Sequence, residues 1–359
     1  MKMRISSFDG LKTVALMCVV INHAYSTMKP SISGVATGFF FVFSGFCLAY
    51  FRGLQSETEH LSVLDIARYI GRKLAMFYPI HLVSFGLAAY LTFSQNLPHA
   101  TCVKRLYEAV PNLLLLHAWF NDLRFTYNGV SWFMSALLFC YMMAIPSLVL
   151  VKRNSRPLRL MFAIAGLLAL RYGMERFVVT FPGGPLVNQH VFPLCRYVEF
   201  LTAMFVGAGA RLIRDKLDEL PREPVWRCIA FNSLDVLSVA VFALLMQGYS
   251  FGYRTLYLGA TLLIAFCFSF DRGVLSWLMG LKAFRWFASI QLEFFMFHQL
   301  CIRFLKPRLT RGDALEYLLP ATLVMTLGLC LTYRLVGCGV RRLWQCGSRR
   351  HEGNVQGGR

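Results

Sequence analysis

The chain has 359 residues, of which 57% are hydrophobic and only 15% are charged. A soluble domain usually has about a quarter charged residues, so this composition favours a polytopic membrane protein. The 37 Lys and Arg residues outnumber the 18 Asp and Glu residues and give a formal net charge of +19. Such an excess also occurs in nucleic-acid-binding proteins, but in an apolar chain the first question is which loops carry the charge.

Ten apolar runs have approximately the length needed to cross a membrane, about 17 to 25 residues. In chain order they are Leu11–Tyr25, Gly34–Phe51, Leu74–Phe93, Val130–Val151, Leu160–Thr180, Arg196–Leu212, Ile229–Gln247, Gly252–Phe270, Phe287–Leu305 and Tyr317–Cys338. A further run, Asn112–Phe120, is too short to cross, and we expect it to be an interfacial or re-entrant piece on the outer side. The sequence therefore predicts an all-α polytopic membrane protein, a bundle of about ten transmembrane helices.

The distribution of basic residues predicts the orientation of this bundle. With the N-terminus inside, the predicted cytoplasmic segments hold about three times as many Lys and Arg residues as the outer segments. This ratio agrees with the positive-inside rule and puts both termini in the cytoplasm. Most of the net charge is therefore topological, which argues against nucleic-acid binding. The expected location is a bacterial-type inner membrane.

The chain ends and the cysteines add three expectations. No typical cleavage site follows the first apolar run, so we expect it to be retained as the first span. The membrane domain covers residues 1–345, and residues 346–359 are polar and Gly-rich, which favours a disordered cytoplasmic tail. The 11 cysteines contain no CxxC pair, so neither a disulfide framework nor a metal site is predicted.

The first span contains two ionisable side chains on one face of the helix. Lys12 and His23 are eleven positions apart, which is roughly 20° beyond three full turns and roughly 16 Å along the axis. Each taken alone is equally well explained by contact with the membrane interface, but polar groups at membrane depth are costly and often functional. Asp9 precedes Lys12 by three positions and either caps the first turn or pairs with the lysine, and its spacing favours the cap.

The stretch "SFDGLKTVALMCVVINHA" followed by "GVATGFFFVFSGFCLAYF" resembles the opening of the membrane-bound acyltransferase 3 family. In that family an Asp-Gly pair and a basic residue precede a His by ten intervening positions, and a Phe-rich span then leads into Ser-Gly-Phe. The matching residues here are Asp9, Gly10, Lys12 and His23, and then Phe39 to Phe46. The first basic residue is Lys where Arg is commoner in the family. Ser44 and Gly45 within the second motif are expected to permit close helix packing.

Three later motifs are similar to the same family, with two departures. "ARYIGRKLAMFYPIH" resembles its basic cluster before a Pro and supplies Arg72 and Lys73, although Met76 replaces a second arginine. "GVSWFMSALLFCYMMAIP" resembles its Trp-led motif and supplies Trp132 and Tyr141, although Leu137 stands where many members have Glu. "SIQLEFFMFHQL" resembles a late-span pattern and supplies Glu293 and His298. These last two are five positions apart, or about 140° around a helix, so we expect them to face different neighbours.

The resemblance implies an enzyme that transfers an acyl group, usually acetyl, from cytoplasmic acyl-CoA to a hydroxyl of a surface glycan or its lipid-linked precursor. His23 is the predicted general base, because a neutral imidazole takes a hydroxyl proton near pH 7. Direct transfer is favoured over an acyl-His intermediate. Lys12, Arg72 and Lys73 are the predicted ligands of the coenzyme A phosphates. Acetyl-CoA is then a co-substrate, with no permanently bound cofactor, and membrane lipid and a glycan are the partners.

Other polar residues leave alternatives open. Asp9, Trp132, Tyr141, Glu293 and His298 are expected to support or bind substrate, and His298 is equally well explained as a satisfied core histidine. Elsewhere, Arg171 and Glu175 are four positions apart and are expected to form an ion pair. Trp119, Trp132 and Tyr127 are expected in an aromatic belt, with a glycan site as the minority alternative.

Two other classes of function also fit the sequence. A transporter or flippase of a lipid-linked saccharide would bury His, Glu and Arg residues in its spans in the same way, although the absence of repeated halves weakens this reading. A sensor or scaffold without activity would explain Met76 and Leu137, but the presence of Lys12 and His23 argues against it.

Overall fold

The structure is a computed structural model of the whole chain. It describes residues 4–25, 32–52, 62–94, 98–180, 188–220, 225–247, 254–309 and 316–356. These residues form helices and connecting turns, with no strand among them. The helices are α1 (Ser7–Ala24), α2 (Ile32–Arg52), α3 (Val63–Phe93), α4 (His99–Leu113), the 3-10 helix η2 (His117–Trp119), α5 (Trp132–Arg153), α6 (Pro157–Thr180), α7 (Pro193–Asp218), α8 (Val225–Gln247), α9 (Arg254–Phe268), α10 (Val274–Met279), α11 (Lys282–Leu309) and α12 (Leu318–Gln356).

Local sequence explains where several of these helices begin. The Ser62 side chain accepts a hydrogen bond from the Asp65 N–H, and the Asp65 carboxylate accepts one from the Ser62 N–H, which is a capping box at the start of α3. Pro193 is the first residue of α7, where the missing N–H costs nothing because it would have no partner within the helix.

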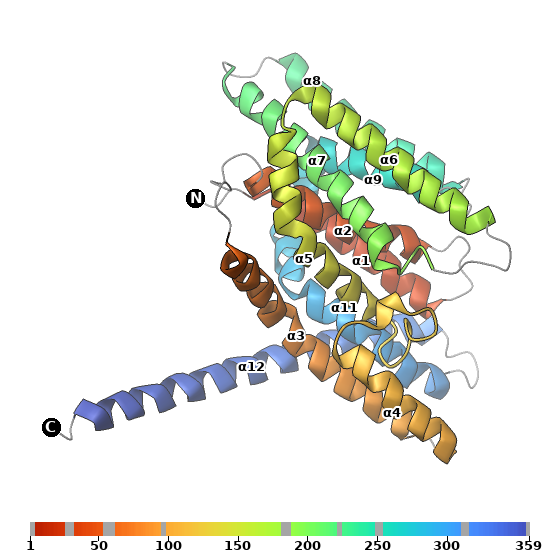
Figure 1. Cartoon of the computed structure of the whole chain (residues 1–359), viewed down its shortest axis with the longest axis vertical. Helices are drawn as coiled ribbons and strands as arrows, with labels where there is room; N and C mark the ends of the chain where they lie inside the picture. Colours follow the sequence, from red (N-terminus) through yellow and green to blue (C-terminus); the bar gives the residue numbers. More distant parts are fainter. Residues whose placement is uncertain are drawn as a thin grey trace.

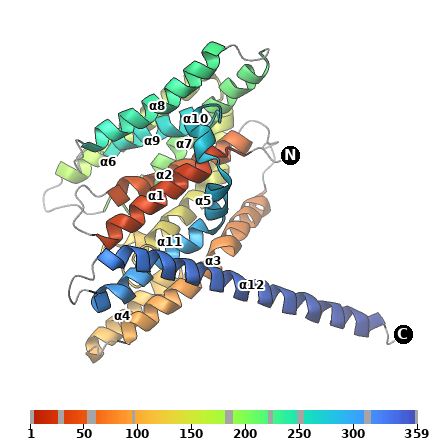
Figure 2. The ribbon, with the colours of Figure 1, turned by 180° about the vertical axis from the view of Figure 1, so that it is seen from behind.

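The helices form a bundle in which α1, α2, α5 and α11 occupy the middle (Figure 1). On one side lie α6, α8 and α9, and on the other lie α3, α4 and α12, and the reverse view shows the same order (Figure 2). The far end of α12 extends well beyond the bundle in both views.

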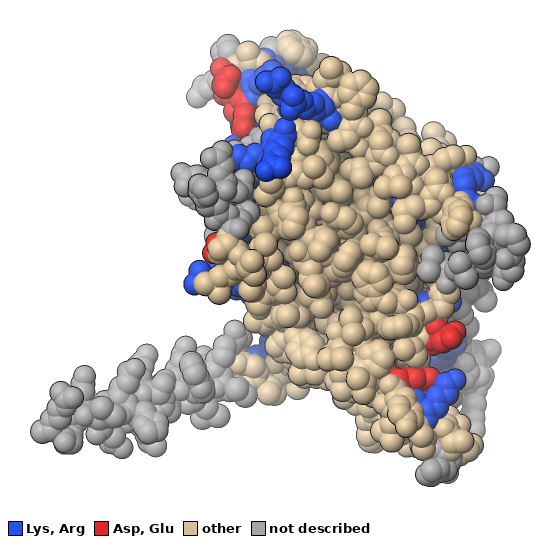
Figure 3. All heavy atoms as spheres, viewed as in Figure 1, with Lys and Arg blue, Asp and Glu red and all other residues tan. Residues whose placement is uncertain are grey.

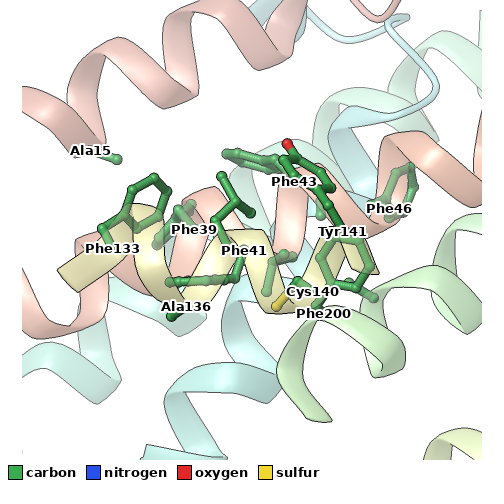
Figure 4. Close-up of a cluster of buried hydrophobic side chains, with 14 of the residues drawn as sticks. Ala15, Phe39, Phe41, Phe43, Phe46, Phe133, Ala136, Cys140, Tyr141 and Phe200 are labelled. Atoms are coloured by element: carbon green, nitrogen blue, oxygen red, sulfur yellow. The ribbon is translucent and has the colours of Figure 1, made fainter. Parts of the chain in front are cut away.

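Aromatic side chains of α2 fill the centre of the bundle (Figure 4). Phe41 packs edge-to-face on Phe133 of α5, with 4.9 Å between the ring centroids, and Phe43 packs on Phe8 of α1 at 4.5 Å. Such aromatic pairs contribute about 0.5–1.5 kcal/mol each beyond their buried area. The Phe-rich motif of the second span therefore forms the core that fixes α1 relative to α5.

Glycines bring α2 and α7 close together. A side chain at Gly45 would collide with the backbone carbonyl oxygen of Phe200, and one at Gly207 would collide with that of Phe46. Small residues at a helix crossing allow the two backbones to approach, which is how membrane helices gain packing energy. This contact confirms the packing role expected for Gly45.

Six described helices are long and apolar enough to cross a membrane: Ser33–Arg52, Val63–Phe93, Trp132–Arg153, Pro157–Phe177, Val225–Met246 and Leu318–Gly339. On the face shown in Figure 3, described charged side chains gather towards two opposite edges, and a broad band between them is uncharged. Helices α1, α7 and α11 coincide with three more predicted spans but are more polar, because they carry residues such as Asp9, Arg196 and Glu293. The all-helical class is confirmed, and the count of about ten spans stays a prediction.

Several helix boundaries differ from those expected. α3 begins at Val63 rather than at Leu74, because the Ser62 capping box starts the helix earlier, so Pro79 lies inside it. The short helices α4 and α10 were not predicted, and the run Asn112–Phe120 contains the end of α4 and η2. α12 continues to Gln356 and so overlaps residues 346–359, of which 357–359 lie outside the described residues.

Candidate active site

His23, near the end of α1, is paired with His298 of α11. Nδ1 of His23 lies 2.9 Å from Nε2 of His298, and the two rings are nearly parallel with 5.2 Å between their centroids. His298 is fully buried, whereas His23 is partly exposed. This hydrogen bond joins two residues that are 275 positions apart in the chain.

The partners of His298 determine which nitrogen carries each proton. Nδ1 of His298 lies 2.7 Å from the backbone oxygen of Phe295, and a carbonyl oxygen only accepts hydrogen bonds. Nδ1 of neutral His298 therefore carries the proton, and its Nε2 accepts one from Nδ1 of His23. Nε2 of His23 is left with a lone pair and without a proton, which is the form that a general base requires.

A polar cavity of about 620 Å³ lies beside His23. Its lining includes Trp132 of α5, Arg303 of α11 and His190, which precedes α7, together with residues of the segment 121–127. Asn121, Asp122 and Phe125 are exposed side chains of this lining, so the cavity reaches the surface of the chain. A cavity of this size accommodates a small-molecule group or a sugar residue.

The cavity lining carries more positive than negative charge. Arg105, Arg124 and Arg303 line it, whereas Asp122 is the one acidic residue in the described lining. Arg105 forms an ion pair with Glu108 at 2.7 Å. Guanidinium groups donate several hydrogen bonds in a fixed geometry, so this lining suits ligands rich in hydroxyl, carboxylate or phosphate oxygens.

A buried ion network supports the inner wall of this cavity. Arg196 donates to Nδ1 of His190 at 2.6 Å and to its backbone oxygen at 2.7 Å. Arg196 also pairs with Glu199 at 2.5 Å, and Arg171 of α6 pairs with the same carboxylate at 3.2 Å. The two guanidinium groups compensate the buried carboxylate, which burial alone would disfavour.

This network corrects the ion pair predicted within one helix. Arg171 pairs with Glu199 of α7 rather than with Glu175. Glu175 instead accepts hydrogen bonds from the backbone N–H and hydroxyl of Thr255, at 2.9 and 2.8 Å. Helical spacing places Arg171 and Glu175 on one face, but α7 and the start of α9 offer hydrogen-bond partners that satisfy each group separately.

Asp9 and Lys12 lie in the first turns of α1, at the opposite end from His23. Asp9 forms an ion pair with Arg4 at 2.5 Å. The N-cap residue of α1 is Ser6, and its N–H and hydroxyl both donate to Asp271, so the capping role expected for Asp9 is wrong. The Lys12 ammonium lies 5.9 Å from the centre of the Phe43 ring.

The remaining two basic residues of the predicted coenzyme site, Arg72 and Lys73, have different surroundings. The Lys73 ammonium lies 4.3 Å from the centre of the Tyr141 ring, so these two predicted site residues are in contact. Arg72 is exposed on another face of α3, and its Nε donates to the backbone oxygen of Arg68. Cation–π contact with Tyr141 compensates part of the cost of burying Lys73.

Glu293 and His298 face different neighbours, as their spacing predicts. Glu293 pairs with Arg334 of α12 at 2.9 Å, whereas His298 contacts His23. The ion pair explains how a carboxylate is accommodated on a helix within the bundle.

Two of the three residues predicted for the aromatic belt, Trp132 and Tyr127, make buried contacts instead. Trp132 packs on His190 with 4.7 Å between the rings, and Tyr127 is buried with its hydroxyl donating to the backbone oxygen of Arg105. Both rings line the cavity, whereas Trp119 packs on Phe139 outside it.

Sequence reasoning missed His190 and its partner Arg196. A usable signal was present, because Arg196 and Glu199 are ionisable residues three positions apart inside an apolar run, and such residues often mark a functional site. His190 lies just before Pro193, in a turn rather than in a span, so span-by-span reading passed over it.

Comparison with known proteins agrees with the geometry. The apolar helices make the chain a membrane protein. The sequence profile of the acyltransferase 3 family, described as "Acyltransferase domain", matches residues 5–336, so the chain belongs to this family. It is similar to a protein from Streptomyces mycarofaciens named "Acyltransferase MdmB", with 26% identity over 230 residues. The match spans 57% of each chain. No solved structure gives a significant match.

Proposed function

We propose that the protein is an O-acyltransferase that moves an acetyl group from cytoplasmic acyl-CoA to a hydroxyl of a surface glycan or its lipid-linked precursor. The observation that carries this proposal is the hydrogen-bonded His23–His298 pair beside a polar cavity. An acyl thioester needs a hydroxyl nucleophile and a base to take its proton, and the unprotonated Nε2 of His23 is such a base.

In the proposed reaction, the acceptor oxygen attacks the thioester carbon while its proton passes to Nε2 of His23. The tetrahedral intermediate collapses, the carbon–sulfur bond breaks, and the protonated His23 returns the proton to the leaving sulfur. The products are the O-acyl ester and free coenzyme A, so atoms and charge balance. While His23 carries the extra proton, His298 accepts its Nδ1–H and stabilises the imidazolium.

The cavity supports a hydroxylated acceptor. Its arginines and amide groups can donate to several sugar oxygens, and Trp132 provides an aromatic face of the kind on which sugars stack. The relative from Streptomyces is named only as an acyltransferase, and the glycan acceptor therefore rests on the chemistry of the lining and on the family resemblance.

The other end of α1 is the proposed entry for the coenzyme. Lys12 and Lys73 are charged groups beside aromatic rings, and Arg72 is exposed for contact with a phosphate. Arg72 would bind phosphate at the cytoplasmic surface, whereas Lys12 would guide the pantetheine arm along α1 towards His23. This arrangement requires the N-terminal end of α1 to face the cytoplasm.

Contacts at that end of the bundle support the orientation. Ser6 donates to Asp271, which follows α9, and Arg272 pairs with Asp218 at the end of α7. These segments are among those predicted to be cytoplasmic from their basic residues, and they meet on one side of the bundle. We therefore propose about ten spans with both termini cytoplasmic, in a bacterial-type inner membrane.

The test uses membranes that contain the protein, radiolabelled acetyl-CoA and a polysaccharide acceptor. We expect the wild-type protein to label the acceptor and His23→Ala to abolish labelling. His81→Ala is the matched control, because His81 is another buried histidine, donates from Nε2 to the backbone oxygen of Asn112 and does not line the cavity. Labelling that survives His23→Ala would refute the mechanism, and a wild-type protein that labels no glycan would favour transport of a lipid-linked saccharide.

A further inference from the structure

The cavity beside His23 is lined by a second histidine, His190, whose ring makes the opposite kind of hydrogen bond. Nδ1 of His23 donates to His298, whereas Nδ1 of His190 accepts from Arg196. His190 lies in the turn that precedes α7 and lines the same cavity as His23. Two hydrogen bonds from Arg196 hold it, one to its ring and one to its backbone oxygen. The indole of Trp132 packs against its ring. Its orientation is therefore fixed from three directions.

Arg196 determines where His190 carries its proton. A guanidinium only donates hydrogen bonds, so Nδ1 of His190 must accept the one from Arg196 at 2.6 Å. The neutral ring then carries its proton on Nε2. Burial, reinforced by the positive charge of Arg196, holds the pKa of His190 well below its usual value, so the ring stays neutral at physiological pH.

Arg196 is in turn fixed by an ion pair and by two aromatic rings. Its Nη1 pairs with Glu199, which also binds Arg171 of α6, and its guanidinium packs over the rings of Phe41 and Trp132. Arg196 is 3% exposed, so it cannot easily turn away from His190. The buried network thus explains how one tautomer of His190 is maintained.

We infer that Nε2–H of His190 is the hydrogen-bond donor that stabilises the negative oxygen formed on the thioester carbonyl during acyl transfer. This inference rests on the proposed function. Acyl transfer needs a base for the hydroxyl proton and a donor for the developing oxyanion, and the cavity contains one imidazole of each kind. His23 presents a lone pair on Nε2, and His190 presents a proton on Nε2.

A neutral donor suits this role because it changes no protonation state during the reaction. As the acceptor oxygen attacks, the carbonyl π electrons move onto oxygen, and the His190 N–H strengthens its hydrogen bond to that oxygen. When the carbon–sulfur bond breaks, the carbonyl re-forms and the proton has remained on His190 throughout. Neutral imidazole donors in other enzymes polarise carbonyl groups in this way. Arg196 is then a positioning residue.

The experiment compares His190→Leu with His190→Gln in the purified full-length protein, using labelled acetyl-CoA and an acceptor that the wild-type protein labels. Removal of one oxyanion donor typically lowers kcat about 100- to 1,000-fold. We expect that loss for His190→Leu, with the KM of the acceptor nearly unchanged. His190→Gln places an amide N–H close to the position of Nε2, so we expect it to recover at least tenfold of the loss.

A second readout separates this role from acceptor binding. Slow hydrolysis of acetyl-CoA, with water as acceptor, passes through the same oxyanion, so His190→Leu should reduce hydrolysis and transfer by similar factors. A group that only binds the acceptor would leave hydrolysis unchanged. The dependence of rate on pH that arises from His23 should also persist in His190→Gln.

Four outcomes overturn the inference. His190→Leu with wild-type kcat refutes it while leaving the proposed function intact, and so does a change confined to the KM of the acceptor. If His190→Leu does not fold, a His190→Gln variant that folds but shows no more activity than His23→Ala refutes the donor role. A wild-type protein that transfers no acyl group refutes the proposed function itself, and with it the inference.

Discussion

Replacement of His298 by leucine tests the proton arrangement on which the proposed mechanism depends. In the wild-type protein His298 accepts the Nδ1 proton of His23 at 2.9 Å, and its other nitrogen is committed to the Phe295 carbonyl. Leucine has no acceptor, so His23 loses the partner that keeps its Nε2 unprotonated. His298→Gln is the matched variant, because its side-chain oxygen can accept the same proton.

The size of the effect has a lower and an upper bound. The bond between His23 and His298 is neutral in the resting protein and charge-assisted when His23 is protonated. A charge-assisted hydrogen bond is worth about 1.5–3 kcal/mol and a neutral one about 0.5–1.5 kcal/mol. The midpoints of these two ranges differ by about 1.3 kcal/mol, which corresponds to roughly tenfold in kcat. If the tautomer of His23 is also lost, the whole contribution of a general base disappears, which is about 100- to 10,000-fold.

The assay is steady-state transfer of labelled acetyl groups by purified protein, with thermal unfolding as the measure of folding. We expect kcat of His298→Leu to fall at least tenfold and His298→Gln to retain more activity. His81→Leu, which removes a buried histidine away from the cavity, should leave kcat unchanged. A folded His298→Leu variant with kcat within twofold of wild type would contradict the proposed arrangement of protons.

Three further predictions concern stability, measured by thermal unfolding in detergent. Gly45→Ala should destabilise the chain by about 1–3 kcal/mol, because its added methyl group collides with backbone. Gly38→Ala should not, because its methyl group makes only an ordinary contact, 3.7 Å from Nη1 of Arg196, and equal effects would disprove the close crossing of α2 and α7. Glu199→Gln should lower the free energy of unfolding by about 3–5 kcal/mol, because it leaves buried guanidinium groups uncompensated. Asp215→Asn, which removes a half-exposed ion pair, should lower it by less than about 1 kcal/mol. Burial lowers the pKa of His117 to about 3, so as the pH is lowered the unfolded chain protonates this ring at a higher pH than the folded chain does. Each unit by which the pH is lowered between about 6.5 and 3 should therefore reduce the free energy of unfolding by about 1.4 kcal/mol. His117→Asn should reduce that slope, and an unchanged slope would show that other groups cause it.

The helical class and most helix positions followed from the sequence, because hydrophobic runs of membrane length permit few other structures. The boundaries were less predictable. The start of α3 depends on Ser62 and Asp65, which lie outside the apolar run, and α4 is too polar to be recognised as a span. The central position of the Phe-rich stretch of α2 could not be predicted from the sequence, because it depends on which helices pack against α2.

For the site, the sequence by itself determined that Lys12 and His23 share one face of the first helix, because the geometry of an α-helix fixes the angle between residues. It also determined that Glu293 and His298 face different neighbours. Only the tertiary structure decided what those neighbours are. The pairing of His23 with His298 and of Arg171 with Glu199 joins separate helices, and no local spacing specifies which helix lies beside which. Packing of α1 against α11 and of α6 against α7 sets those neighbours, and hydrogen bonds across the resulting contacts then set the positions of the histidine protons.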